Sequence, residues 1–211
     1  NFPGGRYGAA ARVGPDGKAR LFGGYGVSAS GTGWLNDLWT WNGAGWIWIS
    51  GSNGPNQPGA YGTKGVSAPE NVPGARVGAI SWTDASGSLF LLGGQEEPSS
   101  SDWTSLSDLW KWDGVNWTWV GGANAPDQPG TYGTKGVPAA GNEPGARFSP
   151  GMSRDASGNV YLFGGLGASA TGRIGVLNDL WGWDGTAWTW LSGSDGTSQA
   201  GVYGTKGFAS S

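Results

Sequence analysis

The stretch that decides the fold is Asp37-Leu38-Trp39-Thr40-Trp41, followed after a short gap by Trp46-Ile47-Trp48. The same pattern returns as Asp108-Leu109-Trp110-Lys111-Trp112 and again as Asp179-Leu180-Trp181-Gly182-Trp183, at a period of 71 residues. Side chains two positions apart lie on one face of an extended chain. The alternating tryptophans therefore predict β-strands, and the fixed period predicts a repeat architecture.

Other residues recur once in each of the three copies. They are Tyr61, Tyr132 and Tyr203 at the start of Tyr-Gly-Thr-Lys-Gly, Gly23, Gly93 and Gly164 in a Gly-Gly pair after an apolar run, and Arg6, Arg76 and Arg147. One supersecondary unit is therefore present three times.

The second copy shows the expected strands most clearly, at roughly 76–83, 88–93, 107–113 and 116–121. Asp84-Ala85-Ser86-Gly87 and Asp113-Gly114 separate the paired strands, and such sequences tolerate the positive φ of tight hairpins. No segment of useful length has an apolar period of 3.6 residues, so little helix is expected. Each unit should be a four-stranded antiparallel meander.

A repeated four-stranded meander is the blade of a β-propeller. An apolar run ending in Gly-Gly, then Asp-Leu-Trp-x-Trp, then Trp-x-Trp, with an arginine at the start of each unit, resembles kelch repeats. The long Gly-rich link resembles that of bacterial, secreted kelch proteins. The resemblance covers the whole chain and implies an all-β propeller with three blades, half of a six-bladed ring or part of a longer propeller.

The repeat divides the chain into blades and links. We place the blades at about 1–51, 76–122 and 147–193, and the Gly/Pro-rich links at 52–75, 123–146 and 194–211. In a meander the tight turns lie at one end of the blade. The second-to-third loops, 25–35, 95–106 and 166–177, lie with the links at the other end, which is the candidate binding face.

Composition excludes several classes of function. The net charge of −3 gives no electrostatic attraction to nucleic acid or to anionic membranes, and no apolar run is long enough to span a bilayer. The chain has no Cys and no His, which excludes zinc sites built on them and His-dependent catalysis. We expect no metal and no cofactor. The copper-radical oxidases of the galactose oxidase type share kelch blades, but their His and Cys ligands are absent, so that activity does not carry over.

The strand tryptophans have two interpretations, blade packing or sugar stacking. Each can bury on the order of 200 Å², and a chain with few Leu and Ile needs that area, so packing is expected. The twelve residues are Trp39, Trp41, Trp46, Trp48, Trp110, Trp112, Trp117, Trp119, Trp181, Trp183, Trp188 and Trp190.

Three aromatic residues fall in the variable loops, outside the strand pattern. They are Tyr25, Trp34 and Trp103. Exposed aromatic rings are platforms for a sugar ring or a protein partner, so these residues are ligand-binding candidates. The alternative is that they only pack within their loops.

The repeated link contributes a tyrosine and a lysine to every unit. The pairs are Tyr61 and Lys64, Tyr132 and Lys135, and Tyr203 and Lys206. A ring of ligand pockets is one interpretation, and a structural loop with a buried tyrosine is the other.

The recurring arginines also have two possible roles. Arg6, Arg76 and Arg147 could bind anionic ligands in bidentate fashion, or they could pair with the recurring Asp37, Asp108 and Asp179. The structural pairing is the expected one.

Catalytic candidates are few. Paired carboxylates could support glycoside cleavage, and only Glu96, Glu97 and Asp102 cluster in one loop. Neighbouring residues seldom face one ligand together, so we expect no enzyme.

The two ends of the chain continue the repeat in register, from Gly207-Phe208 into Asn1-Phe2-Pro3-Gly4-Gly5-Arg6. Three blades are too few for a closed propeller of about 4–8 blades. Two copies could join head to tail, the chain could belong to a longer propeller, or open contacts could give a fibre.

The sequence thus predicts an extracellular or cell-surface binding module that recognises a carbohydrate or a surface protein. A self-assembling structural protein is the alternative, and a carbohydrate-active enzyme is the second alternative.

Overall fold

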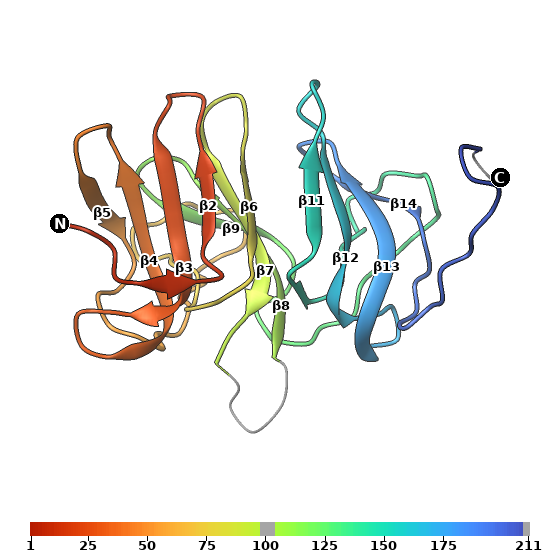
Figure 1. Cartoon of the computed structure of the whole chain (residues 1–211), viewed down its shortest axis with the longest axis horizontal. Coiled ribbons are helices and arrows are strands. Elements are labelled where there is room, and N and C mark those ends of the chain that lie inside the picture. The colour runs from red at the N-terminus through yellow and green to blue at the C-terminus, as the bar shows by residue number, and fades with distance from the viewer. Residues whose placement is uncertain (98–103, 209–211) are drawn as a thin grey trace.

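The computed structural model describes residues 1–97 and 104–208, and all regular structure within them is β-strand. The strands form three antiparallel sheets, one for each repeat of the sequence (Figure 1). No helix in this part of the chain is long and apolar enough to cross a membrane.

The second repeat forms a simple meander. Its sheet has the order β6-β7-β8-β9. The strands are β6 (Ile80–Thr83), β7 (Leu89–Gln95), β8 (Ser105–Trp112) and β9 (Trp117–Gly121).

The first and third repeats follow the same path, but their innermost strand is divided in two. The first sheet contains β1 (Arg6–Tyr7), β2 (Ala10–Val13), β3 (Ala19–Val27), β4 (Thr32–Trp41) and β5 (Trp46–Ser50). The third contains β10 (Arg147–Phe148), β11 (Gly151–Arg154), β12 (Val160–Ala168), β13 (Ile174–Trp183) and β14 (Trp188–Ser192). Gly8 and Ser149, with φ of 65° and 51°, lie at the two interruptions. This positive φ turns the backbone between the two short strands.

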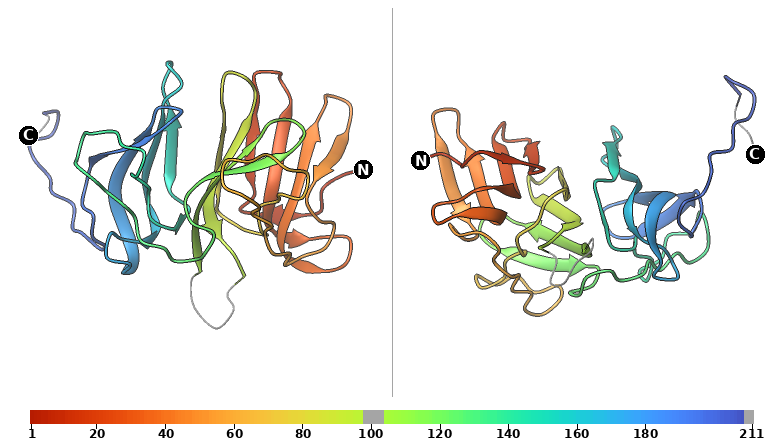
Figure 2. Two further views of the ribbon diagram at one scale, coloured as in Figure 1. Left: turned by 180° about the vertical axis from the view of Figure 1, so that it is seen from behind. Right: turned by 60° about the horizontal axis from the view of Figure 1, so that its bottom comes forward.

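The sheets stand side by side along an arc, with the two termini at opposite ends (Figure 2). Their innermost strands meet through backbone hydrogen bonds. The N–H of Gly78 donates to the carbonyl of Gly8, and the N–H of Ser149 donates to that of Gly78, each at 2.8 Å. This places β1, β6 and β10 on the inside of the arc.

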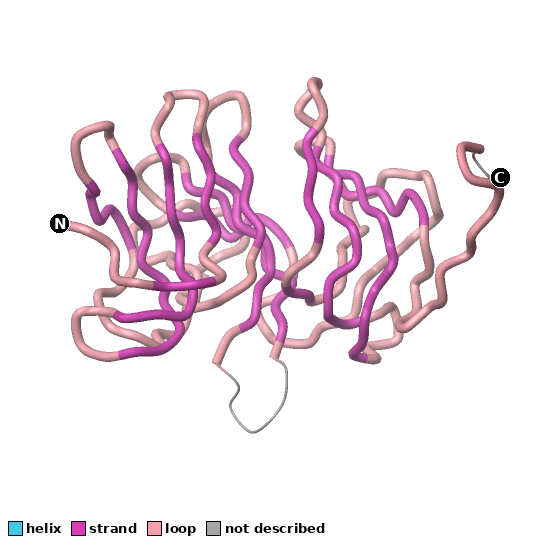
Figure 3. The backbone as a smooth tube through the Cα atoms, viewed as in Figure 1, coloured by secondary structure: helices cyan, strands magenta, loops and turns pink. Residues whose placement is uncertain are grey.

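The tight hairpins lie at one end of the sheets, whereas the long links run beside the outer strands (Figure 3). Ala68 bridges to Trp117 at the start of β9, and the Ser67 hydroxyl donates to Asp113 in the β8–β9 turn. The β2–β3, β4–β5, β6–β7 and β11–β12 turns lie at one end, and the β3–β4 connection lies at the other (Figure 1). The position of the tight turns agrees with the meander expected from the sequence. The expected position of the links, at the opposite end with the second-to-third loops, is wrong in part, because the links bind along the outer strands as far as the tight-turn end.

The Gly-Gly pairs do not end their strands. In each sheet the register shifts at the pair, between Phe22 and Gly24, Leu92 and Gly94, and Phe163 and Gly165. These are β-bulges, and their glycines have positive φ that residues with a Cβ rarely adopt. The strands then continue, so the expected loops at 25–35 and 166–177 are wrong in extent. Only 28–31 and 169–173 lie between the strands.

The second and third sheets each pack their tryptophan-rich face against the preceding sheet. Trp110, Trp112 and Trp117 of the second sheet are buried with Phe22 and Leu38 of the first. The third sheet repeats this packing. Its buried residues Val160, Leu162, Trp181 and Trp188 lie in one cluster with Ile80, Trp82, Phe90, Leu92 and Leu109 of the second. The core of the chain therefore lies between the sheets.

Candidate functional site

Each sheet carries a buried charged unit beside its tryptophans. In the second repeat Arg76 forms a bidentate ion pair with Asp108, with Nη1–Oδ1 and Nη2–Oδ2 distances of 2.6 and 2.8 Å. The indole N–H of Trp110 and the hydroxyl of Tyr61 also donate to Oδ2, at 2.7 Å each. The guanidinium donates further to the carbonyls of Gly74 and Gly93. Both charges are thus fully desolvated and hydrogen-bonded.

The third repeat reproduces the unit. Arg147 pairs with Asp179 at 2.8 Å through both nitrogens, and the hydroxyl of Tyr132 donates to Asp179 Oδ2 at 2.6 Å. Trp181 donates to the same oxygen at 2.7 Å. The pairing of arginine with aspartate that was expected from the sequence is therefore observed.

In the second and third repeats the tyrosine of the unit comes from the link that precedes the sheet. Ala60 and Val72 form a backbone bridge that folds the first link into a loop, and Ala68 bridges to Trp117 of the outer strand β9. This path places the ring of Tyr61 4.9 Å from that of Trp110 and 5.2 Å from that of Trp119. The first and second links therefore each bind to the sheet that follows them, across the joint between repeats.

The lysine of the same link lies over the outermost tryptophan. Lys64 Nζ is 4.8 Å from the ring centre of Trp119, and Lys135 Nζ is 4.2 Å from that of Trp190. These are cation–π contacts at exposed positions. Both lysines are exposed, and both tyrosines are at least half-buried.

Burial and charge act on the ionisation of this unit. Burial first, and then the neighbouring aspartate charge, raise the pKa values of Tyr61 and Tyr132 far above the ordinary value of 10.0. Burial opposes ionisation of Asp179 and would raise its pKa. Arg147 outweighs this effect through its hydrogen bonds and its positive charge, and Tyr132 and Trp181 donate further hydrogen bonds. The pKa of the Asp179 carboxyl therefore lies below its usual value.

These tyrosines should make the fold sensitive to alkali. A pKa that is higher in the folded state contributes stability below the unfolded value of about 10, and that contribution is lost as the pH rises above it. We expect the free energy of unfolding, measured in denaturant between pH 8 and 11, to fall above about pH 10. A double variant, Tyr61→Phe with Tyr132→Phe, should lose most of this slope. An unchanged slope would show that other groups cause it.

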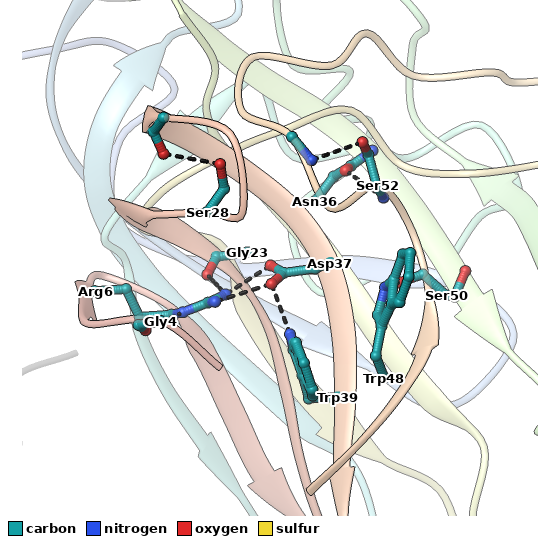
Figure 4. Close-up of polar contacts among 12 residues, drawn as sticks. Gly4, Arg6, Gly23, Ser28, Asn36, Asp37, Trp39, Trp48, Ser50 and Ser52 are labelled. Carbon is teal, nitrogen blue, oxygen red and sulfur yellow. Dashed lines mark hydrogen bonds and ion pairs between the residues drawn. The ribbon is translucent and has the colours of Figure 1, made fainter. Parts of the chain in front are cut away.

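The unit of the first repeat is incomplete. Arg6 pairs with Asp37 at 2.6 and 2.9 Å, and Trp39 donates to Asp37 Oδ2 at 2.6 Å (Figure 4). Within the described residues Asp37 accepts hydrogen bonds from Arg6 and Trp39, and no tyrosine hydroxyl reaches it.

A cavity of about 430 Å³ lies at this incomplete unit, and its lining is largely apolar. Arg6 and Asp37 form its charged part, while the rings of Trp39 and Trp48 form an aromatic wall (Figure 4). Trp48 is 44% exposed. The cavity could therefore take an aromatic ring that carries a hydrogen-bond donor for Asp37, or a sugar ring.

The loop aromatics are placed differently from the expectation. Tyr25 lies in β3 and Trp34 in β4, where they pair across the strands with rings 4.9 Å apart. Their assignment to a loop is wrong because the strands extend past the Gly-Gly bulge. Tyr7, which the sequence analysis did not select, lies 5.5 Å from Tyr25 and is 67% exposed. Trp103 lies outside the described residues.

The structure describes only part of the loop that holds Glu96, Glu97 and Asp102. Glu96 is half-buried, and burial raises its pKa, while Glu97 is exposed. Asp102 lies outside the described residues. No three acidic side chains gather in residues 1–97 and 104–208 in a way that could hold a metal ion.

The twelve strand tryptophans differ in burial, and Trp119, Trp183 and Trp190 are half-buried. Trp110, Trp112, Trp117, Trp181 and Trp188 are buried between sheets. Their counterparts in the first repeat are more exposed, with Trp41 at 36%. The sequence could not predict these differences, because the copies are nearly identical and only their neighbours differ.

Comparison with known proteins finds similar folds among solved structures. No protein-family model matches the chain, and no curated protein matches it. The solved structure of YjhT aligns with 91% of this chain and 54% of its own, with a TM-score of 0.57 and 16% identity. A fucose lectin from Kordia zhangzhouensis, solved with methyl-fucoside, aligns with 87% of this chain and 96% of its own, with a TM-score of 0.37 and 16% identity.

At this identity the likeness to YjhT is one of fold alone, and the likeness to the lectin is too slight to carry an argument. The chain spans about half the length of YjhT. Its antiparallel sheets, packed face to face along an arc, together with the fold shared with YjhT, fit a β-propeller.

Proposed function

We propose that the chain is a non-enzymatic propeller module of the kelch type whose function is assembly, and that two copies join head to tail into one closed ring. The observation that carries the proposal is the exposure of matching faces at the two ends of the arc. Phe163 of the third sheet is 54% exposed, whereas its counterpart Phe22 in the first sheet is 1% exposed because the second sheet covers it. At the other end, Trp48 and Trp41 are exposed.

The two exposed faces are complementary. Inside the chain, Phe22 packs edge-on against Trp117 of the next sheet, with ring centres 5.6 Å apart. The counterparts at the free ends are Phe163 and Trp46. Large exposed apolar faces mark interaction sites, and a contact between unlike faces closes into a ring when the rotation fits. The chain spans 54% of YjhT, so two copies supply about the length of one such chain.

The blade divisions at 1–51, 76–122 and 147–193, with links at 52–75, 123–146 and 194–211, belong to this proposal. So does an extracellular or cell-surface location in a bacterial setting. The resemblance of the Gly-rich links to those of secreted bacterial kelch proteins is the reason for proposing that location, and the absence of cysteine is compatible with it.

The experiment is the native mass of the purified chain by light scattering after size exclusion. We expect a single species at twice the chain mass of 21.6 kDa. A monomer at high concentration would refute self-assembly, and large polydisperse species would refute the closed ring.

Glycan recognition is the second candidate function. The observation that favours it is the group of aromatic rings formed by exposed Tyr7 and half-buried Tyr25 and Trp34, because aromatic rings at a surface can stack on sugars. A glycan array should give binding that Tyr7→Ser abolishes and that Tyr161→Ser, on another strand, leaves intact. An array without binding across broad sugar classes would refute this candidate.

A further inference from the structure

The third copy of the Tyr-Gly-Thr-Lys-Gly segment has no sheet to bind in this chain. Tyr132 is 6% exposed in its unit, whereas Tyr203 is 95% exposed. Val202 and Phe208, on either side of this third copy, are 98% and 77% exposed. Two packed copies and one exposed copy of the same segment indicate a binding element without its partner.

The Thr205–Phe208 turn of the exposed segment has the backbone geometry of the packed copies. The N–H of Phe208 donates to the carbonyl of Thr205 at 3.1 Å, as Val66 does to Thr63 and Val137 to Thr134 at 3.0 Å each. Gly207 has a φ of 88°, beside 82° and 80° at Gly65 and Gly136. A turn formed in advance reduces the entropy lost on binding.

We propose that residues 202–208 of one copy bind the cavity at Asp37 of a second copy and complete its charged unit. The inference rests on the proposed self-assembly and names the segment and the site that carry it. The cavity lacks a tyrosine that both counterpart units possess, and Tyr203 lacks the aspartate that both counterpart tyrosines contact.

The packed copies define the contacts of this complex. The Tyr203 hydroxyl donates to Asp37 Oδ2, and its ring lies between Trp39 and Trp48, as Tyr132 lies 4.8 Å from Trp181 and 5.1 Å from Trp190. Lys206 lies over Trp48. The N–H of Gly207 donates to the Trp48 carbonyl, as Gly65 does to Trp119 and Gly136 to Trp190 at 2.8 Å each.

The segment and the cavity of one chain do not meet. They lie at opposite ends of the arc, where the N- and C-termini are found (Figure 1). A second copy of this chain carries, in residues 202–208, the same tyrosine and lysine that fill the two internal units, and this match is the reason for choosing it as the occupant.

An engineered disulfide tests the contact. Ala60 and Val72 bridge through two reciprocal hydrogen bonds of 2.8 and 2.9 Å, and the counterparts at the free ends are Val202 and Phe2. Residues in such a pair have Cα atoms about 5.5 Å apart, within the range of a disulfide. The chain has no cysteine of its own, so nothing competes with the introduced pair.

We expect the Phe2→Cys, Val202→Cys variant, once oxidised, to give crosslinked species of two or more chains on a non-reducing gel. Either single variant should give far less. The Ala60→Cys, Val72→Cys variant is the matched control, and its disulfide should form within one chain. Absence of intermolecular crosslinks, when the control pair oxidises fully, would overturn the proposal and leave the cavity to a different occupant.

The crosslinking result distinguishes the proposed contact between residues 202–208 and the Asp37 cavity from the proposed closed ring of two chains. A ladder of crosslinked chains supports the contact and refutes the closed ring, whereas a mass of two chains without the crosslink supports assembly and refutes the contact.

A second variant measures what the Tyr203 hydroxyl alone contributes to association. Tyr203→Phe should weaken association by about 10- to 100-fold, the range for one hydrogen bond to a charged group, in sedimentation experiments over a concentration series. Tyr132→Phe makes the same change inside the chain, so it should lower stability and leave association unchanged. Equal association of wild type and Tyr203→Phe would overturn the role given to this residue.

Discussion

Replacement of Asp108 with alanine is expected to lower the free energy of unfolding by about 3–5 kcal/mol, the cost of removing one partner from a buried ion pair. Arg76 and Asp108 both have fully buried side chains, so the guanidinium would keep its charge without a counter-ion. Trp110 and Tyr61 would lose their acceptor as well. Chemical denaturation measured by tryptophan fluorescence would report the loss.

The double replacement Arg76→Met with Asp108→Leu is the informative control. Buried ion pairs often contribute little net stability relative to apolar residues of similar volume, because desolvation offsets their attraction. We therefore expect the double variant to recover the part of the loss that comes from the unpaired guanidinium, while the Tyr61 and Trp110 donors remain without an acceptor. A loss below about 1 kcal/mol in Asp108→Ala would contradict the view that the unit is closed to water.

The sheet pattern was predictable because it depends on local signals. Alternating Trp110 and Trp112 mark one strand, and Asp113-Gly114 marks the turn that follows it. The observed β8 and β9 occupy nearly the expected residues. A period of 71 residues then assigns the same elements to the other copies.

The ends of the strands were harder to predict, as Tyr25 and Trp34 illustrate. The sequence shows a glycine pair between an apolar run and a variable stretch, and such a pair can either end a strand or form a bulge. The choice depends on the partner strand. Gly24 pairs with Leu35 and the ladder continues to Val27 and Thr32, which no local pattern reveals.

The candidate site depends on contacts between repeats. The recurrence of tyrosine, arginine and aspartate indicated a shared unit, but the Tyr61 hydroxyl meets Asp108, 47 residues later and in the following sheet. A repeated sequence shows that a residue recurs and does not show which copy it contacts. The open unit at Asp37 is visible only when the first copy is compared with the others in space.

Replacement of Trp117 with alanine is expected to cost about 3–5 kcal/mol of folding stability, the usual range for a buried tryptophan. Its side chain is fully buried, with ring centres 5.6 Å from Phe22 of the first sheet and 5.4 Å from Trp112 of its own. The cavity would open between two sheets, where neither backbone can move without breaking the hydrogen bonds that join the innermost strands. Calorimetry or chemical denaturation would measure the loss.

Trp46→Ala is the matched variant, because it removes the same side chain at the same place in the repeat. Trp46 is only half-buried, since no sheet of its own chain covers it. We expect a stability loss in the isolated chain well below that of Trp117→Ala, together with weaker association of copies. Equal stability losses in the two variants, with association unchanged, would show that the tryptophan face of the first sheet does not need a partner. That result would refute an assembly that buries this face.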